Sequence, residues 1–144
     1  NHTRIDHLAK GTMSRELYRG ILDGHGRGVF NGKVVVAPHA VKTDAQQANH
    51  NLILSRSAEI DTKPELEIYA DDVKCSHGAS IGQLDEQQLF YLRSRGLDAE
   101  AARSLLITAF AEQLLKSLPY PALASHARRL LSESIAQISL EEHS

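Results

Sequence analysis

The hydrophobic residues of this chain follow two different periods, and the change falls near residue 84. Up to residue 84 the apolar runs are of strand length, as at residues 34–36 and 66–68, and Gly, Asp and Asn separate them. After residue 84 the apolar residues recur at spacings of three and four, which is typical of amphipathic helices. The pattern therefore predicts a β plus α protein, with a strand region at residues 1–84 and a helical region at residues 85–144.

The strand region leaves its topology open. Leu66, Ile68 and Ala70 alternate with polar or larger neighbours, which predicts a half-buried strand. Asn31 and Gly32 form a pair typical of a two-residue hairpin turn, so we expect a turn there. The other corners are several residues long. This arrangement suits either a sandwich or a solenoid of short strands, and periodicity does not choose between them.

The helical region divides into three helices. Asp85 is a suitable N-cap for the first, Gly96 follows its end, Asp98 caps the second, and the third begins near Pro121. The predicted apolar stripes are Ala102, Leu105, Leu106, Ala109, Phe110 and Leu114 in the second helix, and Leu123, Ala127, Leu130, Leu131, Ile135 and Ile138 in the third. A bundle this small buries little surface alone, so we expect it to pack on the strand region or on a partner.

Composition excludes several classes of function. The formal net charge is −2 and no Lys/Arg cluster stands out, so we expect no nucleic-acid partner. No apolar run approaches the ~20 residues of a membrane span, and no P-loop motif predicts a bound nucleotide. One cysteine suits a reducing compartment, which favours a cytoplasmic location. The first residues contain no initiator Met and no signal pattern, so we expect the C-terminal part of a longer protein.

The single cysteine, Cys75, lies two residues before His77 in the segment VKCSHGASIG. In an extended strand these two residues share a face, with Cα atoms roughly 6.5 to 7 Å apart. A nucleophile and its base must approach to about 3 Å, so a hydrolase dyad is disfavoured. A thiolate and an imidazole that flank one metal ion need only ~2.0 to 2.3 Å each to the metal, which suits iron, zinc or copper.

Two ligands make only half of a metal site. The chain contains no second cysteine and no histidine pair at ligand spacing, so the missing ligands would come from the nearby Asp71 and Asp72 or, more naturally, from another subunit. The alternative is that Cys75 packs in a core and His77 is an ordinary polar residue. Asp71 and Asp72 are adjacent and face opposite ways in a strand, which argues against a shared acid/base site. The other histidines are scattered, at positions 2, 7, 25, 39, 50, 126 and 143.

Asn49 and Asn51 lie two residues apart just before the run LILS. This spacing fits either a turn or a polar ladder that faces inward along a strand. We expect a structural role in both cases.

Residues 46–97 carry a longer set of motifs: NLILS, a PxLEI segment, DDVxCxHGA and LFYLRSRG. Together they resemble the C-terminal core of the SufB/SufD family of iron–sulfur cluster assembly proteins. The segment CSHGASIGQLDEQQLFYLRSRGL is closer to the SufD branch of that family.

The resemblance implies a fold: the last coils of a right-handed parallel β-helix at residues 1–84, followed by a C-terminal helical domain at residues 85–144. It also implies a scaffold of the SufBCD complex and not an enzyme. Such a scaffold pairs with SufB through the β-helix and docks the SufC ATPase through the C-terminal helices. SufC, and not this chain, would then bind the nucleotide.

The resemblance extends to the site residues. In this family iron or a nascent cluster is held between the two paralogues, and His77 matches a histidine ligand. Cys75 matches a cysteine near the same interface, which either binds metal or packs. Two other functions stay open, namely a purely structural adaptor without a metal ligand and a β-helix carbohydrate-active enzyme. We also expect that the isolated chain is able to pair with itself, because a cut β-helix exposes strand edges.

Overall fold

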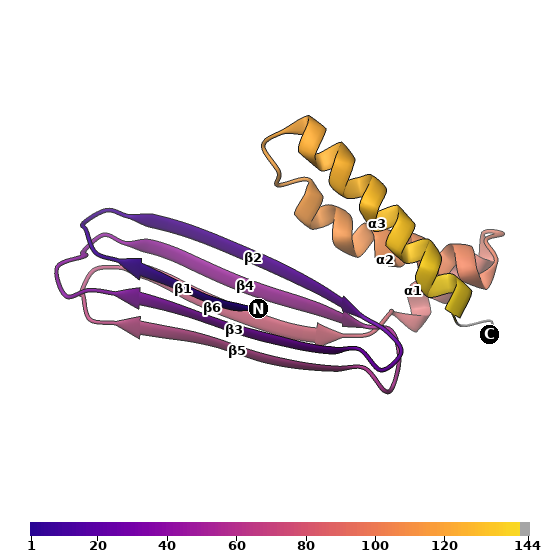
Figure 1. Cartoon of the computed structure of the whole chain (residues 1–144), viewed down its shortest axis with the longest axis horizontal. Helices are drawn as coiled ribbons and strands as arrows, with labels where there is room; N and C mark the ends of the chain where they lie inside the picture. The colour runs from indigo at the N-terminus through magenta and orange to yellow at the C-terminus, as the bar shows by residue number, and fades with distance from the viewer. Residues whose placement is uncertain (142–144) are drawn as a thin grey trace. The chain divides into compact units, whose positions relative to one another are not determined.

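A computed structural model describes the backbone of residues 1–141 and the side chains of residues 1–136. The described chain forms six strands followed by three helices (Figure 1). The chain divides into two compact units, a strand unit at Asn1–Gly82 and a helical unit from Gln83 onward. The elements are β1 His2–His7, β2 Met13–Leu22, β3 Arg27–Val36, β4 Asp44–Ile53, β5 Glu59–Ile68, β6 Lys74–Gly82, α1 Glu86–Ser94, α2 Ala99–Leu115 and α3 Pro121–Glu141.

The six strands form two parallel three-stranded sheets. One sheet has the order β1-β3-β5 and the other has the order β2-β4-β6, so the chain changes sheet at every connection (Figure 1). The hairpin predicted at Asn31 and Gly32 is therefore wrong, because both residues lie inside β3 and pair with parallel strands on each side. Gly32 has a packing role instead, since a Cβ there would lie 2.5 Å from Nε2 of Gln47.

The core of the strand unit lies between the two sheets. Its buried cluster combines Val34 and Val36 of β3, Ala45 of β4, and Ala40 and Ala70 of the connections. Leu66 and Cys75 pack against this cluster. The predicted alternation in β5 is thus confirmed for Leu66 and Ala70, whereas Ile68 near the end of the strand is 43% exposed.

The connections before β2, β4 and β6 are stacked corners. Gly11, Lys42 and Asp72 all adopt positive φ angles of 70°, 63° and 55°. Backbone hydrogen bonds tie successive corners together, from Gly11 N to Val41 O and from Lys42 N to Asp72 O, both at 2.9 Å. This stacking fixes where β6 begins, and with it the position of the residues that follow.

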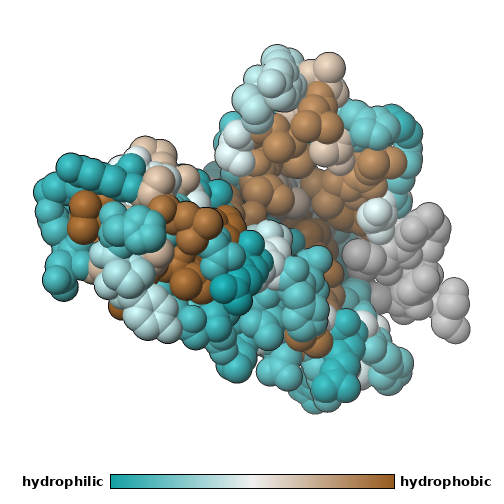
Figure 2. Space-filling view, turned by 60° about the vertical axis from the view of Figure 1, so that its left-hand side comes forward, coloured by the Kyte–Doolittle hydropathy of each residue, from teal (hydrophilic) through white to brown (hydrophobic). Residues whose placement is uncertain are grey.

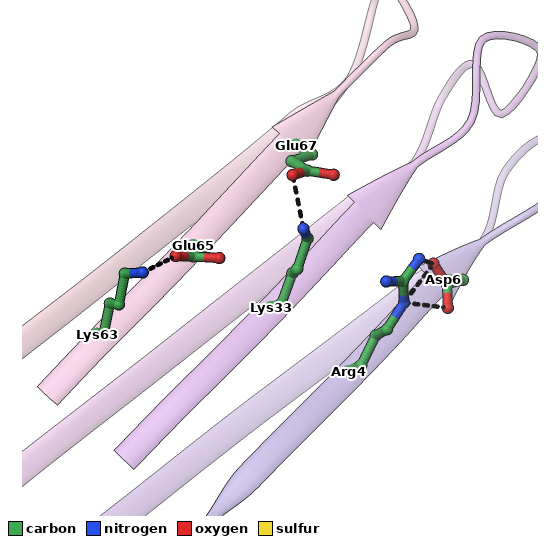
Figure 3. A network of polar contacts seen from close by, with 6 residues as sticks. All are labelled: Arg4, Asp6, Lys33, Lys63, Glu65 and Glu67. Atoms are coloured by element: carbon green, nitrogen blue, oxygen red, sulfur yellow. Dashed lines mark hydrogen bonds and ion pairs between the residues drawn. The ribbon is translucent and has the colours of Figure 1, made fainter. Parts of the chain in front are cut away.

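The outer face of the β1-β3-β5 sheet is charged. Figure 3 shows three of its ion pairs, Arg4 with Asp6, Lys33 with Glu67 and Lys63 with Glu65. The hydrogen bond from Arg4 lowers the pKa of Asp6, and the bond from Lys63 lowers the pKa of Glu65. Both signs of charge alternate on this solvated face, and exposed pairs of this kind contribute little to stability.

The helix boundaries follow the predicted caps. Oδ1 of Asp85 accepts a hydrogen bond from Gln87 N at 2.8 Å, and Oδ1 of Asp98 accepts one from Ala101 N at 2.7 Å. Gly96 has a φ of 98° just after α1, and α3 begins at Pro121. These four signals of the sequence are confirmed, because a cap is read from a few adjacent residues.

The buried faces of α2 and α3 are narrower than the predicted stripes. The buried residues are Ala102, Ile107 and Leu115 in α2 and Ala124 and Ile135 in α3. Leu105 and Leu130, which were predicted to be inside, are 48% and 46% exposed, and Ile138 lies outside the residues whose side chains are described. Apolar residues occur on several sides of α2, so periodicity does not identify the buried side.

Among the described residues, no helix combines the length and the apolar character needed to cross a membrane.

Candidate functional site

Strand β6 carries both predicted site residues at the edge of its sheet. It pairs in parallel with β4 and with no other described strand. Its start is held by the hydrogen bond from Lys74 N to Thr43 O at 2.8 Å. Cys75 and His77 are both within the strand, so alternation places them on the same face, as the sequence predicts.

Cys75 faces the space between the sheets. It pairs with Ala45, which is 1% exposed, and it packs against the core cluster. The thiol is free and only partly buried. One side of Cys75 therefore contacts hydrocarbon, which suits a packing role, and its part in binding metal stays a prediction.

His77 lies one step further along the same face and is exposed. It pairs with Gln47 of β4, and Gln47 in turn pairs with Glu16 of β2. Because neighbouring residues of parallel strands point the same way, the side chains of Glu16, Gln47 and His77 form one row across the sheet. We call these three residues the inner polar row.

Sequence reasoning missed Glu16 and Gln47. Gln47 is 2% exposed and its Nε2 donates a hydrogen bond to Oε1 of Glu16 at 3.3 Å. Oε2 of Glu16 accepts a further bond from Thr3 Oγ1 at 3.3 Å across the two sheets. The signal that could have found them is the strict alternation of β4, in which residues 45, 47, 49 and 51 are buried.

Of the two structural roles left open for Asn49 and Asn51, the structure shows the inward ladder, because both residues lie within β4. Both are 3% exposed, and Asn51 Nδ2 donates to Asn49 Oδ1 at 2.7 Å. Thr62 Oγ1 of β5 donates to the same oxygen at 2.8 Å, which links the two sheets. These amides satisfy one another and have a structural role.

The remaining polar candidates do not converge on His77. Asp72 forms an ion pair with Lys42 at the corner. His50 contacts Ser80 Oγ at 2.7 Å on the opposite face of the sheet, whereas His7 is buried between Thr12 and Ser14 at the first corner. Within the described residues no group of three or more His, Cys, Asp or Glu side chains is placed to hold a metal ion. The metal-binding roles of Cys75 and His77 therefore stay predictions.

A comparison with known protein families identifies the family of this chain. Residues 1–110 match the family described as "SUF system FeS cluster assembly, SufBD core domain". The chain belongs to the SufBD core family. The match covers all six strands of the strand unit together with α1 and most of α2.

Individual SufBD relatives agree. The chain is 52% identical over 116 residues to the iron–sulfur cluster assembly protein SufD of Escherichia coli, which covers 81% of this chain and 27% of that protein. It is 50% identical over 119 residues to an iron–sulfur cluster assembly SufBD family protein of Synechocystis, with 83% and 26% covered. It is 43% identical over 116 residues to the Arabidopsis thaliana protein ABCI7, chloroplastic, with 80% and 24% covered. The chain spans about a quarter of the length of these relatives.

Proposed function

We propose that this chain is part of a scaffold subunit of the SUF iron–sulfur cluster assembly complex, SufBCD, and that it is not an enzyme. The observation that carries the proposal is the position of His77. It is an exposed imidazole on the inward face of a strand that has one unpaired edge. Iron or a nascent iron–sulfur cluster is the cargo of such a site and not a resident cofactor. Imidazole and thiolate are suitable ligands for iron.

The strand unit would be the last coils of a right-handed parallel β-helix, and residues 85–144 would be a C-terminal helical domain. Two parallel sheets whose strands alternate along the chain support the first part of this proposal. The stacked corners at Gly11, Lys42 and Asp72 support it as well, because each coil of a solenoid repeats the conformation of the previous one.

SufB is the partner we propose for the strand unit. Neither β5 nor β6 pairs with a further described strand on its outer edge, and unpaired edges are suited to pairing with another chain. A partner docked at β6 would approach His77 and supply the ligands that the described residues lack. In the isolated chain the same edges would favour a homodimer.

The helical unit would dock the SufC ATPase. Its exposed large apolar residues include Phe90 at 76%, and Figure 2 shows hydrophobic residues gathered on one face of this unit. A groove of about 300 Å³ lies between α1 and α2, lined by Glu86, Leu89, Phe90, Arg93, Ala99 and Arg103. Exposed apolar patches of this kind mark protein interaction sites. SufC would bind the nucleotide, and the helices would pass its ATP-driven movement to the strand unit. We expect the complex in the cytoplasm.

The replacement His77→Ala tests the proposal. In the complete SufBCD complex, this variant should assemble normally but lose most of its cluster, measured by visible absorbance and by the iron and sulfide content. The matched control is His25→Ala, which removes an exposed histidine from a turn and should keep the full cluster yield. A normal yield from His77→Ala would reject the ligand role and favour the purely structural adaptor.

Cys75 is tested in the same assay. If Cys75 is a ligand, Cys75→Ser should lower the cluster yield. If Cys75 only packs, Cys75→Ala should fold and keep the full cluster yield.

The carbohydrate-active alternative needs a pair of converging carboxylates. On the outer face of the β1-β3-β5 sheet, Asp6, Glu65 and Glu67 each pair with a cation, so this surface does not favour a carbohydrate-active site. A screen for glycan hydrolysis should therefore be negative.

A further inference from the structure

The amide of Gln47 has a fixed orientation. A carboxylate only accepts hydrogen bonds, so the amide must turn its NH₂ group toward Glu16 and its oxygen away from it. That oxygen, Oε1, is buried and has no hydrogen-bond partner among the described residues. Buried acceptors are nearly always satisfied, which makes this atom an exception that requires an explanation.

The inner polar row shows which residue lies on the free side of the amide. Gln47 stands between Glu16 on β2 and His77 on β6. Strands in a sheet are about 4.8 Å apart, and side chains of paired residues point the same way. Of the two residues paired with Gln47, His77 is therefore the one on the side away from Glu16.

The opposite sheet restricts the amide further. Gly32 lies across from Gln47, and a Cβ at position 32 would come within 2.5 Å of Nε2 and 3.0 Å of Cδ of Gln47. The absent side chain leaves the space that the amide occupies. Gln47 is thus held by Glu16 on one side and by Gly32 from across the core.

From this geometry we infer that Gln47 positions His77. Oε1 of Gln47 accepts a hydrogen bond from one ring N–H of His77, which fixes the tautomer of the imidazole and leaves its other nitrogen unprotonated. Histidines that bind metals usually donate their second nitrogen to such an acceptor. In the structure His77 is exposed and does not contact this oxygen, so the bond forms when the His77 side chain rotates inward. The link to cluster assembly rests on the function proposed above, whereas the hydrogen bond itself does not.

The test reads the tautomer of His77 in the metal-free, full-length protein labelled with ¹⁵N-histidine. Long-range ¹H–¹⁵N spectra distinguish the protonated ring nitrogen from the unprotonated one, and His77→Gln assigns the signals. We expect a single tautomer for His77. Gln47→Met keeps the length of the side chain without the acceptor, so it should release the ring to a mixture of tautomers. Gln47→Glu combined with Glu16→Gln keeps a donor and an acceptor between the two side chains as well as an acceptor oxygen for His77, so it should preserve the single tautomer.

The control is Thr62→Val, which removes a polar group of the interior that bonds to Asn49 and to no residue of the inner polar row, and it should not change the His77 signals. If Gln47→Met does not fold, Gly32→Ala supplies the same readout, because it displaces the amide and keeps every polar group; since it also displaces the ring of Phe30, Phe30→Leu is its control. Ferrous iron binding to the metal-free protein should weaken about 10- to 100-fold in Gln47→Met, the range found for other residues that orient metal ligands.

An unchanged single tautomer in Gln47→Met would overturn the inference, whatever the cluster yield of His77→Ala. A released tautomer in Gln47→Met would support the inference even if His77→Ala assembled clusters normally, and in that case only the proposed function would fail.

Discussion

The strand unit and the helical unit bury different kinds of residue. Between the sheets, the amides Gln47, Asn49 and Asn51 are almost fully buried and bond to residues of other strands or to each other. In the helical unit the buried residues are apolar, whereas large apolar side chains such as Phe90 and Leu123 remain exposed. Large apolar side chains such as Met13 and Tyr69 are exposed in the strand unit as well, so among the described residues the two units differ in the polar groups that only the strand unit buries.

This difference separates two kinds of function. A row of polar side chains that runs through a sheet and ends on an exposed histidine is suited to presenting a ligand in a defined orientation. A helix pair with exposed leucine and aromatic residues is suited to burying area against a partner. The contacts also differ in sequence separation, because strand pairing joins residues far apart in the chain and the helix caps join neighbours.

The largest effect is expected from the apolar core of the helical unit. Ile107→Ala removes a residue that is 1% exposed and should lower the free energy of unfolding by about 2 to 5 kcal/mol. Leu105→Ala, two residues earlier and 48% exposed, should change it by only about 0.5 kcal/mol. Hydrogen exchange of the α2 amides measures both. Equal losses of protection would mean that the buried face of α2 is assigned incorrectly.

A smaller effect is expected from the polar interior of the strand unit. Asn49→Ala removes the acceptor of the Thr62 hydroxyl and of one Asn51 bond, and it should cost about 1 to 3 kcal/mol, the usual penalty for buried groups that lose a hydrogen bond. Exchange of the β4 and β5 amides should report it. The control His50→Ala alters the next residue, on the outer face, and should leave those amides protected. If Asn49→Ala were neutral, the inward ladder would not contribute to stability.

The smallest effect is expected from the ion pair that joins α2 and α3. Arg128 donates two hydrogen bonds to Glu112, and the first of these lowers the pKa of that carboxyl below its ordinary value. Because the pKa of Glu112 is lowered in the folded state, the ion pair makes its full contribution to stability above the pKa that Glu112 has in the unfolded chain. This contribution to stability is lost as the pH falls through the pKa of the folded state.

An NMR titration of the Glu112 carboxyl carbon checks this pH dependence. In Arg128→Gln the pKa of Glu112 should return toward its ordinary value, with little change in stability because the pair is at the surface. Arg129→Gln is the matched control, since Arg129 pairs with Glu133 within α3. A Glu112 pKa that stayed low in Arg128→Gln would indicate another cause for the shift.

Local signals were predicted from the sequence more reliably than long-range ones. The caps at Asp85 and Asp98 depend on adjacent residues, and they are confirmed. Asn31 and Gly32 carry a strong local turn signal, yet two parallel neighbours keep them in a strand. Pairing between distant segments therefore outweighed the turn preference.

The candidate site shows the same limit. Alternation was enough to place Cys75 and His77 on one face, because it involves only residues within one strand. Gln47 was missed because its relation to His77 depends on the register between β4 and β6, which no local pattern contains. The metal-binding roles of Cys75 and His77 stay predictions for the experiments above.

The corner before β6 also sets a parity. Residues of a strand alternate between its two faces. If one residue between Ala70 and Lys74 were deleted and β6 still paired with β4 along the same positions, every side chain of β6 would point to the opposite face of the sheet. Ser76 and Gly78 would then turn to the interior, and the imidazole would turn to the solvent side of the sheet. Insertions or deletions of two residues would preserve its direction. The length of this short connection is thus as restrictive for engineering the protein as the identity of the histidine itself.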